Sequence, residues 1–125
     1  RTWPWHDAAS RAWATFANGS AIDALVAGCS VCEREQCDGS VGWGGSPDER
    51  GETTLDALVF DGNTMNAGAV ADLRNVRDAA QAARFVLERT SHTLLAGDQA
   101  TRFAYEMGLK KATLESNKSQ AMWSA

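Results

Sequence analysis

The 125-residue sequence lacks the features that would point to a nucleic acid or to a membrane. Its 12 Lys and Arg residues are scattered among 16 Asp and Glu residues, whereas nucleic-acid binding needs basic side chains gathered on one surface. No apolar run approaches the roughly 18 residues of a membrane span. The longest run, residues 25–32, is broken by Gly28 and Ser30. Neither a nucleic acid nor a membrane is therefore an expected partner.

The sequence also has no internal repeat, no low-complexity tract and no signal peptide, and an abrupt start at Arg1 is expected of a processed product. What remains has the composition of one globular domain, with 44% hydrophobic residues. Five Trp against one Tyr is the unusual feature. Trp3 and Trp5 flank Pro4 without helical or strand periodicity, which suits a pocket wall as well as a core.

A self-contained set of catalytic groups is missing as well. His6 and His92 have no neighbouring Ser, Asp or Cys in the arrangement of a triad, so we interpret both as structural. The Gly-rich stretch 42–47 has neither the GK[ST] of a phosphate-binding loop nor GxGxxG spacing after a strand. The acidic residues at 48, 49, 52 and 56 are interpreted as a solvated rim.

The three cysteines fall between residues 29 and 37, and an odd number leaves at least one thiol unpaired. Cys29 and Cys32 have the CxxC spacing of thiol oxidoreductases and zinc sites. They lie in the last turn of a predicted helix, however, whereas a reactive thiol is favoured at a helix N-terminus. A zinc site would also need a fourth ligand. We therefore favour a structural role, in which Cys29 continues an apolar stripe and Cys32 and Cys37 can close a short loop.

Apolar periodicity predicts a pair of helices at the start of the chain. The first carries Trp13 on its core face and ends at residues 18–19. The second begins with Ser20 and Asp23 in the pattern of a capping box, and its apolar stripe reaches Cys29. Helices joined by so short a turn form a hairpin.

The remainder alternates between strand and helix signals. Residues 38–51 hold five glycines and predict an irregular loop. The later predictions are a hairpin with strands at 55–60 and 65–70, a helix capped by Asn75, a short strand at 93–96, a helix from Asp98 to Gly108, and a polar, mobile tail over 109–125. This order indicates an α+β fold whose sheet is small for its helices, so part of the sheet is expected to come from another chain.

Several segments resemble the glycosylasparaginase family of N-terminal-nucleophile hydrolases, that is, N4-(β-N-acetylglucosaminyl)-L-asparaginases. The most specific is residues 32–48, which read CEREQCDGSVGWGGSPD, followed by GETTLD at 51–56 and Asp61-Gly62. Thr2-Trp3-Pro4 and residues 21–24, 68–70 and 90–95 fit the family's α subunit in the same order. The resemblance covers nearly the whole chain up to about Gly108. Plant-type asparaginases share a looser version, without the insert from Cys32 to Cys37.

The resemblance implies that residues 1–125 are the α subunit of such a hydrolase, with an ordered core at 1–108 and a tail at 109–125. Family precursors cut themselves and expose a Thr at the N-terminus of a β chain. That Thr is the nucleophile, its own α-amine is the base, and an acyl-enzyme forms on the way to aspartate and the glycosylamine. The resemblance further implies a four-layer αββα sandwich, an (αβ)2 heterotetramer, a role in glycoprotein degradation in the lysosome (or a secreted or periplasmic location outside animals), and no metal or organic cofactor.

The resemblance also assigns residues to the site. Trp3 would pack on the substrate, Trp5 stands where the family has an aromatic neighbour, and Ser40 would hydrogen-bond the nucleophilic Thr. Cys32 and Cys37 would be bonded, with Cys29 free and buried. The cleavage junction of the family is absent, so no residue here is expected to be the nucleophile. The alternatives are a plant-type asparaginase or isoaspartyl peptidase, a non-catalytic secreted relative, and a thiol or zinc module.

Overall fold

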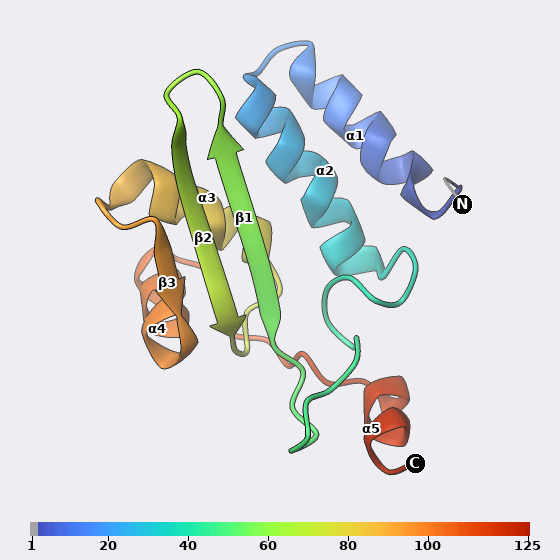
Figure 1. Cartoon of the computed structure of the whole chain (residues 1–125). Helices are drawn as coiled ribbons and strands as arrows, with labels where there is room; N and C mark the ends of the chain where they lie inside the picture. Colours follow the sequence, from blue (N-terminus) through green and yellow to red (C-terminus); the bar gives the residue numbers. More distant parts are fainter. Residues whose placement is uncertain (1–2) are drawn as a thin grey trace.

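The computed structural model describes residues 3–125 and contains a small mixed sheet with helices on one of its faces (Figure 1). Thr2, part of the family resemblance, lies outside the described residues. The elements are a 3-10 turn Trp3–Trp5, helices α1 His6–Phe16, α2 Ala21–Glu35, α3 Ala79–Arg89, α4 Gly97–Glu106 and α5 Asn117–Trp123, and strands β1 Leu55–Asp61, β2 Asn66–Leu73 and β3 Leu94–Ala96.

The helical hairpin α1–α2 forms as the sequence predicts. The capping box that starts α2 is present: the Ser20 hydroxyl accepts from Asp23 N (3.1 Å), and the Asp23 carboxylate accepts from Ser20 N (2.8 Å). The two helices approach closely where the backbone of Gly28 lies against Ala12. The prediction that Trp13 is a core residue is wrong, because α1 packs against α2 and leaves Trp13 78% exposed.

The strand order is β1-β2-β3. β1 and β2 form the predicted antiparallel hairpin, and β3 pairs with β2 in parallel after the chain has crossed over through α3. Helix α3 lies directly on β2 at Gly68, where a Cβ would come within 2.6 Å of Leu87 Cβ. A side chain at this position would push the helix off the sheet.

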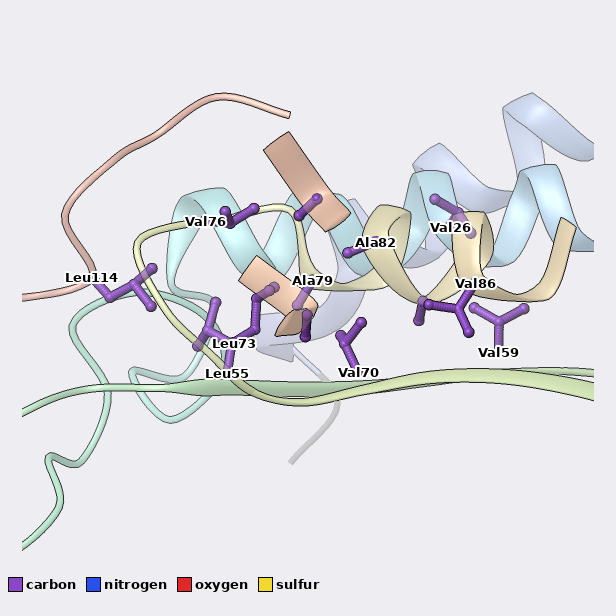
Figure 2. Packing of buried hydrophobic residues seen from close by; sticks show 13 residues of the cluster. Val26, Leu55, Val59, Val70, Leu73, Val76, Ala79, Ala82, Val86 and Leu114 are labelled. Atoms are coloured by element: carbon purple, nitrogen blue, oxygen red, sulfur yellow. The ribbon is translucent and has the colours of Figure 1, made fainter. Parts of the chain in front are cut away.

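The hydrophobic core lies between one face of the sheet and the helices above it. Figure 2 shows Val59 of β1 and Val70 of β2 pointing from the sheet toward Val86 of α3. The alternation of β1 places Leu58 and Phe60 on the opposite face, where both are exposed. The predicted α+β character is confirmed, and the four-layer sandwich stays a prediction.

Two predictions about the later part of the chain are wrong. Asn75 does not cap α3, because it has a left-handed φ of 56° and the helix begins at Ala79 after Asp78. Residues 109–125 are not an irregular tail either. Leu114 is buried in the core, and Ser116 starts α5 with a capping box. The two leucines of this segment, Leu109 and Leu114, do not stand at helical or strand spacing, so periodicity does not reveal that Leu114 is buried.

No helix within residues 3–125 is both long enough and apolar enough to cross a membrane.

Candidate functional site

The disulfide predicted at the end of α2 is confirmed: Cys32 and Cys37 are bonded. Gln36, in a left-handed conformation with φ 54°, ends the helix and lets the chain turn back. Cys29 is free, as predicted, but the prediction that it is buried is wrong, since it is exposed at the wall of a cavity. Because Cys32 is bonded to Cys37, the pair Cys29–Cys32 is not available as a redox dithiol.

The loop after the disulfide carries Ser40, and the Asp38 side chain stabilises the first turn of this loop. One carboxylate oxygen of Asp38 accepts from Ser40 N (2.9 Å) and from the Ser40 hydroxyl (2.8 Å). These hydrogen bonds hold the pKa of Asp38 below its usual value, because they stabilise the charged form, and the bond from Ser40 N has the largest effect. A carboxylate of lowered pKa is a poor base, so the Ser40 hydroxyl is not activated as a nucleophile by Asp38.

On its inner side the loop packs against the end of α2. Gly42 has φ 82°, and a Cβ there would lie 2.7 Å from Glu33 Cα, so a side chain cannot be accommodated. The Trp43 indole donates to Arg34 O (3.1 Å), and its ring stacks under the Arg77 guanidinium, 3.9 Å from the ring centroid. The Gly-rich backbone at Gly42 therefore lies close against the end of α2.

On its outer side the loop is held by residues 114–123, which belong to the segment that was wrongly predicted to be a mobile tail. Gly44 N donates to Leu114 O (2.6 Å), and the Lys118 ammonium donates to Gly39 O (3.1 Å). Farther along, the Gln120 amide donates to Gly51 O (3.2 Å) and the Trp123 indole to Glu49 O (3.2 Å). Residues 114–123 thus fix the position of the loop on both sides of Ser40.

A cavity of about 490 Å³ opens beside this loop, between the α1–α2 hairpin and β1. It is lined mainly by apolar side chains, Trp5 and Leu58 among them. Glu33 also lines it and is only 5% exposed. One Glu33 oxygen accepts from Ala80 N at the start of α3 (2.7 Å), and the other is buried without a partner among the described residues.

Burial raises the pKa of Glu33 to about 7, because removing a carboxylate from water disfavours its charged form more than the Ala80 hydrogen bond favours it. Glu33 is not among the site residues predicted from the sequence. A signal was nevertheless present in the sequence: Glu33 follows Val26 and Cys29 at helical spacing, so a charged residue continues the predicted apolar stripe of the helix.

The remaining predicted site residues are brought together in part. Trp5, 37% exposed, lines the cavity, and so does Val41, the neighbour of Ser40. Trp3 is 85% exposed and is not among the residues that line this cavity. Ser40 is exposed on its loop. The cavity therefore joins Trp5 to the Ser40 loop, and the assignment of Trp3, Trp5 and Ser40 to a substrate site stays a prediction.

The histidines are both at the surface, with the His6 ring 3.1 Å from the Asp7 carboxylate. Between residues 3 and 125, no three His, Cys, Asp or Glu side chains lie close enough to hold a metal ion together.

Comparison with known proteins identifies the family of this chain. The model of the family described as Asparaginase matches residues 1–125. A rat N(4)-(Beta-N-acetylglucosaminyl)-L-asparaginase is 54% identical over 98% of this chain and 36% of its own length. A probable isoaspartyl peptidase/L-asparaginase of Arabidopsis thaliana is 53% identical over 98% of the chain and 35% of its own length. A putative N(4)-(beta-N-acetylglucosaminyl)-L-asparaginase of Drosophila melanogaster is 57% identical over 81% of the chain and 26% of its own length. The chain thus spans between about a quarter and about a third of the length of these relatives, and it belongs to the asparaginase family.

Proposed function

We propose that this chain is the α subunit of an amidohydrolase that cleaves the bond between N-acetylglucosamine and asparagine in glycosylated asparagine. The observation that carries the proposal is the 54% identity with the rat N(4)-(Beta-N-acetylglucosaminyl)-L-asparaginase across 98% of the chain. Because that match spans only 36% of the relative, the nucleophilic Thr is assigned to the remainder of the protein, as the N-terminus of a β chain.

The proposed roles follow from the resemblance and agree with the local geometry. Trp3 and Trp5 offer indole faces that are open to a ligand, since both are exposed at the end of the chain that leads into α1. Ser40 lies on a loop fixed by a disulfide, by α2 and by residues 114–123, which is the rigidity that a group orienting a nucleophile needs. We assign no metal and no organic cofactor to the reaction.

The open face of the sheet supports a partner chain. Leu58 and Phe60 lie on the same face of β1, and both are exposed. An apolar sheet face of this kind is normally covered. We assign its cover to a second sheet from the β chain, which would complete a four-layer αββα sandwich. Two αβ units would then form the heterotetramer, and the proposed setting is glycoprotein degradation in the lysosome.

The test is to produce the full-length precursor and follow its processing. We expect two chains, a β chain that begins with Thr, and release of aspartate from N-acetylglucosaminyl-asparagine. Replacement of that Thr by Ala should abolish the release while the protein still folds. Aspartate release by an uncut precursor, or by the Thr→Ala variant, would contradict the assignment of the nucleophile.

A second candidate is supported by the Arabidopsis relative, a probable isoaspartyl peptidase/L-asparaginase that is 53% identical over the same region. This enzyme would use the same nucleophile on a smaller substrate. Comparing kcat/KM for glycosylated asparagine, free asparagine and a β-aspartyl dipeptide separates the two candidates. Absence of turnover with all three would instead favour a non-catalytic relative.

A further inference from the structure

The hydroxyl of Ser40 has its single hydrogen engaged before any partner arrives. It lies 2.8 Å from an Asp38 carboxylate oxygen, which also accepts from Ser40 N (2.9 Å) and, more weakly, from Val41 N (3.4 Å). An ionised carboxylate can only accept hydrogen bonds, so the Ser40 hydroxyl is the donor in this pair. Among residues 3–125 no group donates to the Ser40 hydroxyl oxygen, so toward a further group Ser40 acts as an acceptor.

The charge on Asp38 persists at acidic pH. Hydrogen bonds from Ser40 lower the pKa of this carboxyl group, so it stays ionised. Two elements that pack against this loop, α2 and α5, carry charged side chains. From α5, the Lys118 ammonium donates to Gly39 O, next to Asp38. From α2, the Glu33 carboxyl is directed away, toward Ala80 N at the start of α3. The Ser40 oxygen is thus polarised by a fixed anion.

We propose that Asp38 is a positioning residue for the proposed hydrolysis, making Ser40 an acceptor for the α-amino group of the nucleophilic Thr. This inference rests on the proposed function, in which Ser40 contacts that Thr. It adds the direction of the hydrogen bond and the source of the charge behind it.

The proton inventory of the first step is consistent with this direction. The hydroxyl proton of the nucleophilic Thr moves to its own α-amine, while an oxygen lone pair attacks the amide carbon of the substrate and the carbonyl π electrons move to the oxygen. The amine becomes an ammonium, which has one more N–H to donate to the Ser40 oxygen. Ser40 and Asp38 keep the protons that they had. Asp38 therefore stabilises the positive charge that appears in this step, through Ser40.

The test is the pH dependence of kcat/KM for the processed, assembled protein carrying Asp38→Asn. Asn keeps a carbonyl oxygen for the turn but has no charge. We expect the acid-side pKa of kcat/KM, which reports the α-amine, to fall by about one unit because an anion near it has been removed. The plateau of kcat should fall by up to about tenfold.

A matched control exists in the β1–β2 turn. Asp61 also accepts one backbone N–H, from Asn63 (2.9 Å), and one hydroxyl, from Thr64 (2.8 Å). Asp61→Asn makes the same chemical change in a similar turn, and its pH profile should match that of the wild type. Asp38→Glu keeps the charge, so its acid-side pKa should stay at the wild-type value even where kcat drops.

The outcomes separate this inference from the function on which it rests. If the wild-type protein hydrolyses glycosylated asparagine but the profiles of the Asp38→Asn and Asp61→Asn variants coincide, the inference is wrong and the proposed function stands. If Asp38→Asn shifts the profile as much in a Ser40→Ala background as alone, Asp38 does not act through Ser40. If Asp38→Asn is not processed, Asp38→Glu decides, and a shifted acid-side pKa in that variant overturns the inference. A wild-type protein without activity overturns both.

Discussion

The buried carboxyl of Glu33 makes stability depend on pH in a direction opposite to that of the other perturbed carboxylates. Its pKa is raised from the ordinary value of 4.5 to about 7, chiefly by burial. The folded state therefore holds the Glu33 proton more tightly than the unfolded state does. The resulting stabilisation is complete below pH 4.5 and is lost as the pH rises toward 7 and above.

The size of the effect follows from the two pKa values. One unit of pKa corresponds to about 1.4 kcal/mol, so the difference between 4.5 and about 7 amounts to about 3 kcal/mol. Glu33→Gln removes the titration and keeps an oxygen that can accept from Ala80 N. We expect the free energy of unfolding of the wild type, minus that of the variant, to fall by about 3 kcal/mol between pH 4.5 and 7.5.

The assay is urea-induced unfolding of the assembled protein at one fixed protein concentration across this pH range. Carboxylates with lowered pKa values, such as Asp23 and Asp38, are present in both proteins and cancel in the difference. Glu35→Gln, at an exposed position of the same helix end, is the matched control and should show no such trend. A flat difference for Glu33→Gln, or one that grows with pH, would refute the argument from burial.

Three further predictions concern the proposed site. Trp3→Ala should lower kcat/KM for glycosylated asparagine without loss of thermal stability, whereas the equally exposed Trp13→Ala should leave kcat/KM unchanged; equal losses would remove Trp3 from the site. Ser40→Ala should lower kcat by at least about tenfold with a smaller change in KM, and an effect on KM alone would mean that Ser40 contacts the substrate. Residues 1–125 purified alone should show no hydrolysis and no cooperative melting, because Leu58 and Phe60 remain uncovered; a monodisperse, cooperatively melting monomer would contradict this.

Local signals in the sequence predicted the local structure well. The Ser20 capping box, the turn at Asp61-Gly62 and the strand that ends at Ala96 all depend on residues close in sequence. The turn at Asp38 could also have been predicted from the sequence, because an Asp side chain often accepts a hydrogen bond from the backbone N–H two residues later. Here Asp38 accepts from both Ser40 N and the Ser40 hydroxyl.

Apart from the helix cap wrongly assigned to Asn75, the errors concern contacts between distant parts of the chain. Periodicity identified the apolar face of α1, but it could not say whether a partner covers Trp13. The polarity of residues 109–125 hid Leu114, whose burial depends on its place in the core and not on its neighbours in sequence. The raised pKa of Glu33 likewise arises from its burial where α2 packs against the start of α3.

The hydrogen bonds between residues 114–123 and the Ser40 loop affect the order in which parts of the chain fold during synthesis. Lys118 and Gly39 lie 79 positions apart, whereas Cys32 and Cys37 lie only 5 apart. As the polypeptide leaves the ribosome from its N-terminus, the two thiols can meet long before residue 123 has been added. The covalent link can therefore form on a loop whose outer contacts do not yet exist. Ser40 reaches its final place only when α5 has emerged and docked, so among the regions of this chain the proposed site is completed late.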